Sequence, residues 1–125
     1  MISDNDTEGQ SVEDTFMAIS GIPKFSDSMK VFLESAQPRV RDSFLALLQS
    51  VNEPYTLDFK TKTLLRVVVC MVLDHENGVR SWGRAALKKG WSREQIVEAM
   101  FAVTPQVGFI PVIRMLQYVP GEQKE

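Results

Sequence analysis

Residues Leu57 to Gly90 read LDFKTKTLLRVVVCMVLDHENGVRSWGRAALKKG, and this stretch decides the fold. Between Leu64 and Leu73 only Arg66 is charged, so the segment is apolar on all sides. Such a pattern predicts a helix that is buried inside a domain or an oligomer. The triplet Asp74-His75-Glu76 follows directly and marks the junction to a second helix.

A line of polar side chains runs along one face of this predicted helix. Thr63, Arg66, Cys70 and Asp74 follow the offsets i, i+3, i+7 and i+11, which lie on one face of a helix. Polar groups on a buried helix need partners, so these four residues are candidate site residues. A buried arginine needs a paired carboxylate or access to water. For Arg66 the carboxylate could come from Asp74, from another helix or subunit, or from a ligand.

The rest of the chain predicts an all-α domain of about six or seven helices. No stretch shows the sustained two-residue alternation of a strand. We expect residues 1–10 to be a disordered tail, residues 11–119 to form the single domain, and residues 120–125 to be a C-terminal tail. Helical periodicity predicts helices near residues 11–19, 29–36, 38–51, 58–73, 76–89, 92–103 and 109–116.

Local signals place several of the helix ends. Ser11 followed by Asp14 predicts an N-cap, and Pro38 suits the first turn of a helix. Ser92 with Gln95 predicts a capping box, and Gly90 predicts the end of the preceding helix. Asp74 is predicted to cap the helix that begins at Glu76, since a short acid accepts backbone N–H bonds there.

Composition excludes several classes of function. The 125 residues carry a net charge of -2 with acids and bases interspersed, so nucleic acid or an anionic membrane surface is not an expected partner. The longest apolar run is far shorter than a membrane span, and the acidic N-terminus does not resemble a signal peptide. The single cysteine forms no intrachain disulfide and fits a cytoplasmic location. We expect no metal or cofactor, because no ligand spacing and no phosphate-binding loop is present.

The order of these segments resembles the carboxymuconolactone decarboxylase and alkyl hydroperoxidase D (AhpD-like) superfamily. The resemblance rests on LDFKTKTLLRVVVCMVL, ENGVRSWGRAALKKG and WSREQIVEAMFAV, which correspond to the apolar helix, the site helix and the following helix of the family. It covers roughly Leu57 to Leu116. The resemblance implies an all-α fold around a two-helix hairpin, and assembly as a homo-oligomer, either a trimer or a hexamer.

The catalytic residues of the family are absent from this chain. In the peroxidase branch the site helix carries C-x-x-C-x-x-x-H, and these positions fall on His75, Gly78 and Trp82. The glutamate position of the family falls on Thr63. A dithiol peroxidase mechanism needs two thiols one helical turn apart, and the chain has only Cys70. The decarboxylase branch would use a histidine at the position of Trp82.

The remaining polar residues suggest a different chemistry. His75 is the only histidine, and histidine is the residue type suited to proton transfer near neutral pH. Arg66 could bind a substrate carboxylate through two parallel hydrogen bonds. In that hypothesis His75 and Arg66 are the catalytic residues, and the pocket is lined by Thr63, Cys70, Asp74, Gly78 and Trp82.

Structural interpretations of the same residues stay open. His75 could be held by hydrogen bonds at the helix junction, Cys70 could be a small buried apolar group, and Trp82 could serve packing alone. Glu76 and Arg80, at i and i+4, are interpreted as a surface ion pair.

Three hypotheses of function follow from these residues. The first is a non-redox lyase or isomerase that acts on a small carboxylate-bearing molecule through His75 and Arg66. The second is a non-catalytic family member that binds a small ligand or a protein partner. The third is a redox protein that uses Cys70 between subunits. Apolar helix faces in excess of what a small monomer buries also favour a homo-oligomer.

Overall fold

The computed structural model of the chain describes residues 12–20 and 27–121, and these residues form helices without any strand. The described ranges contain eight α-helices and one short 3-10 helix, which confirms the all-α class. The predicted tail at residues 1–10 and the predicted cap at Ser11 lie outside them, as do residues 122–125. The chain divides into two compact units, residues 1–55 and 56–125, and each is described by itself.

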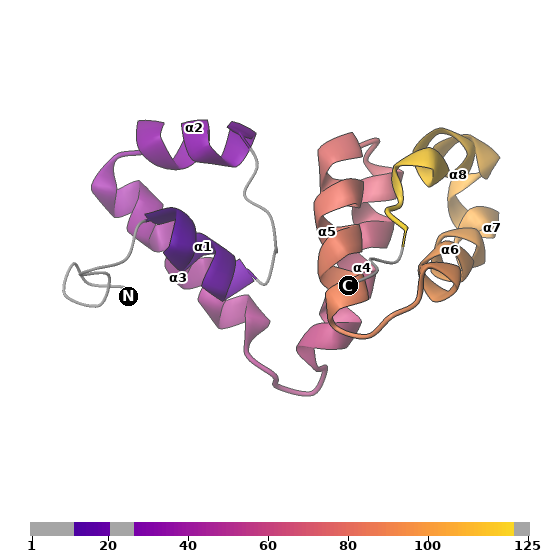
Figure 1. Cartoon of the computed structure of the whole chain (residues 1–125), viewed down its shortest axis with the longest axis horizontal. Helices are drawn as coiled ribbons and strands as arrows, with labels where there is room; N and C mark the ends of the chain where they lie inside the picture. The colour runs from indigo at the N-terminus through magenta and orange to yellow at the C-terminus, as the bar shows by residue number, and fades with distance from the viewer. Residues whose placement is uncertain (1–11, 21–26, 122–125) are drawn as a thin grey trace. The chain divides into compact units, whose positions relative to one another are not determined.

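The first unit contains three helices, α1 (Val12–Ser20), α2 (Asp27–Ser35) and α3 (Pro38–Asn52). Pro38 stands at the start of α3, as predicted, where its missing N–H costs no hydrogen bond. Helix α1 packs on α3 (Figure 1). The small core contains the buried side chains of Phe16, Leu33 and Leu45. Phe44 stacks on Phe16, with ring centroids 6.2 Å apart.

The second unit is built on the antiparallel hairpin of α4 (Phe59–Val72) and α5 (Glu76–Lys88), which pack along each other (Figure 1). Helices α6 (Arg93–Ala102), α7 (Thr104–Val107) and α8 (Phe109–Met115) follow, and the 3-10 helix η1 (Leu116–Tyr118) ends the unit. Its core is a single apolar cluster of buried side chains: Val67, Met71, Val79, Ala86, Ile96, Met100, Val112, Met115 and Val119.

Local hydrogen bonds define the ends of the hairpin helices. The side chain of Asp58 caps α4 by accepting a bond of 2.8 Å from the Thr61 N–H. Helix α5 stops at Gly90, whose φ of 112° is a conformation that favours glycine. The N–H groups of Gly90 and Trp91 donate to carbonyls of the last turn of α5, which is a Schellman motif. The predicted capping box of Ser92 and Gln95 at the start of α6 is confirmed.

The structure of this hairpin bears on two predictions, the burial of α4 inside a domain or an oligomer and the cap of α5, and it contradicts the second. Within the chain, α4 is buried on one side only: Thr63, Val67 and Met71 are fully buried, whereas Leu65 and Val69 are about half exposed. An apolar sequence cannot show which of its sides meets the core. The N-cap of α5 is His75 and not Asp74, and no side chain caps this helix. None of the helices in the described ranges is long and apolar enough to cross a membrane.

Candidate functional site

The candidate site lies along the contact between α4 and α5, which we call the α4–α5 seam. We define it by Phe59, Arg66 and Cys70 from α4, and by His75, Gly78 and Trp82 from the start and body of α5. Phe59, Arg66 and Cys70 follow the offsets i, i+7 and i+11, so they share one face of α4. Because the helices are antiparallel, Cys70 meets the first turn of α5 and Arg66 meets its middle.

Arg66 is held against aromatic rings. Its guanidinium carbon lies 4.7 Å from the ring centroid of Trp82 and 5.8 Å from that of Phe59, both within the range of a cation–π interaction. The Nη1 atom is buried and has no hydrogen-bond partner. Burial lowers the pKa of the guanidinium, although an arginine keeps its charge in proteins. Within the described ranges no carboxylate pairs with this side chain.

Cys70 and His75 converge on Gly78. A Cβ atom at Gly78 would lie 2.5 Å from Sγ of Cys70 and 3.1 Å from Nδ1 of His75, so only a glycine leaves space for both side chains. The backbone N–H of His75 donates to the Cys70 carbonyl at 2.8 Å, which fixes the junction. Burial raises the pKa of the Cys70 thiol, because the thiolate is less stable away from water. The thiol is therefore protonated at neutral pH.

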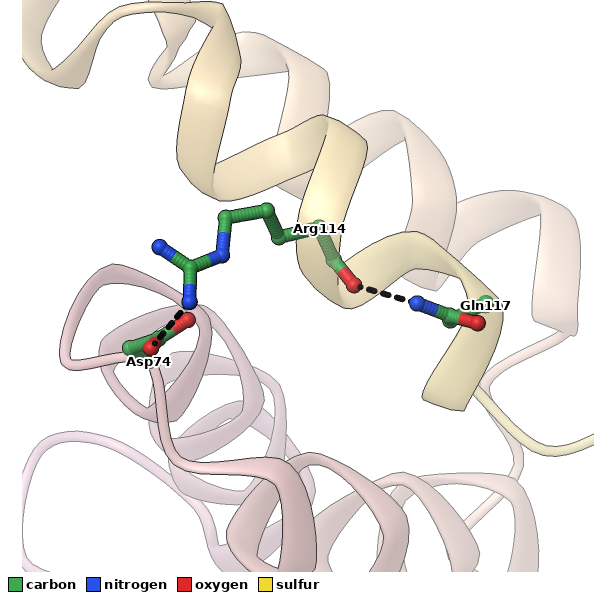
Figure 2. A network of polar contacts seen from close by, with 3 residues as sticks. All are labelled: Asp74, Arg114 and Gln117. Carbon is green, nitrogen blue, oxygen red and sulfur yellow. Dashed lines mark hydrogen bonds and ion pairs between the residues drawn. The ribbon is translucent and has the colours of Figure 1, made fainter.

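Asp74 pairs with Arg114 and so joins the hairpin to α8. Its carboxylate accepts a bond of 2.9 Å from Nη2 of Arg114, and the carbonyl of Arg114 accepts from Nε2 of Gln117 (Figure 2). The backbone of Asp74 is left-handed, with φ of 61°, which aspartate tolerates better than most residues. Asp74 thus serves the turn and the ion pair, and it is not the partner of Arg66 that the sequence suggested.

Thr63 is not part of the seam, because its hydroxyl is hydrogen-bonded within its own helix. The residue is fully buried, and its hydroxyl donates to the Lys60 carbonyl at 2.6 Å. The same carbonyl accepts a bond of 2.7 Å from the indole N–H of Trp91. Of the predicted polar line, the seam therefore retains Arg66 and Cys70. The predicted surface pair of Glu76 and Arg80 is present as an i, i+4 ion pair at 2.6 Å.

Sequence reasoning missed three residues around the site. Phe59 lies on the face of α4 that carries Arg66, and the periodicity alone could have indicated it. In the sequence Lys89 is only a charge near the end of a helix, yet its Nζ lies 5.2 Å from the Phe59 ring centroid. Arg114 is 40 residues away from its partner, Asp74, so no local pattern could have found this ion pair. In the described ranges no three acidic, histidine or cysteine side chains are placed to hold a metal ion.

Comparison with known proteins identifies the family. The model of the carboxymuconolactone decarboxylase family matches residues 38–119, which include every element from α3 to η1. The chain belongs to the carboxymuconolactone decarboxylase family. It is similar in structure to a proposed carboxymuconolactone decarboxylase from Burkholderia xenovorans LB400, with a TM-score of 0.70 at 17% identity, over 87% of this chain and 91% of that one. At this identity the likeness concerns the fold alone. A search of curated proteins gives no match.

Proposed function

We propose that the chain binds a small carboxylate-bearing molecule at Arg66 and converts it as a non-redox lyase or isomerase. The observation that supports this most is the guanidinium of Arg66. It is partly desolvated on the Trp82 ring and lacks a counter-ion in the described ranges. A buried polar group without a partner costs about 1–3 kcal/mol. A ligand carboxylate supplies both the hydrogen bonds and the opposite charge.

His75 is the group that we assign to proton transfer. It is the only histidine of the chain, and its side chain is exposed at the junction where α5 begins. Cys70 lies one helical turn, about 6 Å along the axis, beyond Arg66. His75 meets Cys70 at Gly78, and we propose that a molecule of a few carbon atoms held at Arg66 extends toward the imidazole. This placement supports a role as general acid or base.

The structure favours this chemistry over a redox role for Cys70. A reactive cysteine has a lowered pKa, whereas burial raises that of Cys70. The positions that carry two cysteines in the dithiol motif are His75 and Gly78, and the space beside Gly78 is filled by Cys70. We therefore do not propose a peroxidase.

Calorimetric titration with a panel of small carboxylates and their uncharged amides tests the binding step. We expect carboxylates alone to bind, and Arg66→Gln to weaken binding by at least tenfold, because charge-assisted hydrogen bonds contribute about 1.5–3 kcal/mol. Arg84→Gln is the matched control, since Arg84 lies on α5 outside the seam and is also partly buried. Equal losses in the two variants would contradict the proposal.

Turnover of the carboxylates that bind is then followed by NMR in the wild type and in His75→Gln. We expect turnover to be lost in the variant while the affinity stays within about twofold. Binding that depends on Arg66 but yields no product in the wild type would favour a non-catalytic, ligand-binding family member instead.

We also propose that the chain forms a homo-oligomer, a trimer or a hexamer. Several large apolar side chains of α4 and α8, and that of Leu73 directly after α4, are 40–67% exposed; Phe109 and Ile113 are among them. Exposed apolar side chains in such numbers are typical of interfaces. Sedimentation velocity should show an oligomer that Ile113→Glu dissociates and that Gln106→Glu, at an exposed site on α7, leaves intact. A wild-type monomer at all concentrations would refute this.

A further inference from the structure

We infer that the side-chain amide of Asn77 deamidates spontaneously, so that the first turn of α5 is a site of slow covalent modification. The inference concerns the chain itself and does not depend on the proposed binding of a carboxylate at Arg66. It follows from the peptide bond between Asn77 and Gly78 and from the place of that bond in the helix.

The sequence contains the reactive pair. Asparagine loses its amide group when the main-chain nitrogen of the next residue attacks the side-chain carbonyl carbon, and a side chain on that next residue hinders the attack. Glycine has no side chain, so it permits this close approach of the backbone. The chain contains three asparagines, and only Asn77 is followed by glycine. The other two, at positions 5 and 52, precede an aspartate and a glutamate.

The position at the start of α5 leaves the attacking nitrogen outside the hydrogen bonds of the helix. Inside a helix each N–H is bonded to the carbonyl four residues back, which holds the nitrogen in place. The first such bond at this end runs from the Val79 N–H to the His75 carbonyl, at 3.0 Å. The N–H of Gly78 precedes it and has no acceptor in the helix. His75 is the N-cap residue, and its side chain makes no bond that would close the turn.

Asn77 is also open to water, and Asn52 provides a contrast within the same chain. The side chain of Asn77 is exposed, whereas the side-chain oxygen of Asn52 is buried. After Asn52 the next N–H, that of Glu53, donates to the Ser50 carbonyl at the end of α3. The two asparagines thus differ in the following residue, in exposure and in the bonding of the attacking nitrogen.

The reaction passes through a cyclic imide. The Gly78 nitrogen loses its proton to the solvent and forms a bond to Cγ of Asn77. The bond from Cγ to the amide nitrogen then breaks, and that nitrogen takes up a proton and leaves as ammonia. Water opens the resulting succinimide ring at Cγ to give aspartate, or at the main-chain carbonyl carbon to give isoaspartate. The sum is the loss of ammonia and the gain of water, without oxidation or reduction.

The two products act differently on the hairpin. Aspartate at position 77 adds a negative charge to the first turn of α5, where the helix dipole favours one. Isoaspartate carries the main chain through its own Cβ and Cγ, which lengthens the backbone before Gly78. A Cβ atom at Gly78 would lie 2.5 Å from Sγ of Cys70 and 3.1 Å from Nδ1 of His75, so this turn has no spare space. The longer backbone therefore displaces the turn against which Cys70 and His75 pack.

The test is the rate of conversion at each asparagine of the full chain, incubated for weeks at neutral pH in heavy-oxygen water and followed by peptide mass spectrometry. We expect the peptide with Asn77 to convert at least about tenfold faster than the peptide with Asn52. It should incorporate the heavy oxygen and separate into an aspartyl and an isoaspartyl form. A synthetic peptide of residues 73–82 gives the rate that the local sequence alone allows. The folded chain should stay within about tenfold of that rate, because an uncapped first turn opens readily.

Two variants complete the design. Asn77→Gln keeps a neutral amide at this exposed position and should remain homogeneous over the same time. Asn77→Asp is the aspartyl product made directly, and its urea midpoint should be at least that of the wild type. The isoaspartyl form, isolated by chromatography from the aged wild-type chain, should have a lower midpoint than Asn77→Asp.

Equal rates at Asn77 and Asn52 would overturn the inference. A rate at Asn77 more than about a hundredfold below that of the peptide would also overturn it, because the helix would then protect the amide. An isoaspartyl form as stable as Asn77→Asp would refute the effect on the turn beside Cys70. None of these outcomes bears on carboxylate binding at Arg66, so the two proposals fail separately.

Discussion

Gly78→Ala tests the packing of the seam most directly. The new Cβ atom would lie 2.5 Å from Sγ and 3.0 Å from Cβ of Cys70, well inside van der Waals contact. Overpacking of this kind costs typically 1–3 kcal/mol, because a side chain or the backbone has to shift. Replacing glycine by alanine in a helix returns at most about 1 kcal/mol. Because a separation of 2.5 Å is one that real Cβ atoms do not show, the upper end of this range applies, and we expect a net loss of about 2 kcal/mol in the free energy of unfolding.

Urea unfolding followed by tryptophan fluorescence is the assay, because Trp82 and Trp91 are the only tryptophans and both report on the second unit. The midpoint should fall by on the order of 1 M without a change in slope. Asn77→Ala, at the exposed preceding position, controls for helix propensity.

The same substitution in a Cys70→Ala background isolates the contact. Removal of Sγ leaves the milder crowding at 3.0 Å from Cβ of residue 70 and at 3.1 Å from Nδ1 of His75, so the cost of Gly78→Ala should shrink by at least about 1 kcal/mol. An equal cost in both backgrounds, or a Gly78→Ala chain as stable as the wild type, would refute the reasoning.

Three further predictions concern the C-terminal end, the turn and the thiol. Gly83→Ala should lower the free energy of unfolding by about 2 kcal/mol, because its Cβ would lie 2.5 Å from Cδ of Pro120 and the helix propensity of alanine offsets about 1 kcal/mol of the crowding cost. Ser81→Ala is the comparison and should leave the urea midpoint unchanged. Asp74→Ala should be less stable than Asp74→Gly by about 1 kcal/mol. Both variants lose the ion pair to Arg114, but only glycine adopts a φ of 61° without strain. Equal stabilities of the two variants would contradict this. Burial raises the pKa of the Cys70 thiol, so iodoacetamide should label it in the native chain more slowly at pH 8 than it labels a free thiol. The labelling rate should increase at higher pH. A rate that has already reached its plateau at pH 7 would disprove this prediction.

The predictions that the structure confirms depend on contacts between near neighbours in the sequence. The capping box at Ser92, the stop at Gly90 and the ion pair of Glu76 with Arg80 each join residues no more than a few positions apart. A short motif therefore contains all of the atoms involved. The junction at Asp74 shows the limit of this reasoning, since a partner on α8 takes the carboxylate that the local pattern assigned to a helix cap.

The amino-acid sequence alone was enough to predict the all-α class, the family and most helix boundaries, because periodicity and end signals act within one or two helical turns. Only the fold showed which polar residues of the predicted line lie in the seam. Thr63 is buried and bonded to its own helix, Asp74 pairs with Arg114, and Arg66 lies on the rings of Trp82 and Phe59. A helical face contains the side chains that could meet a ligand. Which of them do so depends on the antiparallel packing of α5 and α8, and that packing joins residues far apart in the chain.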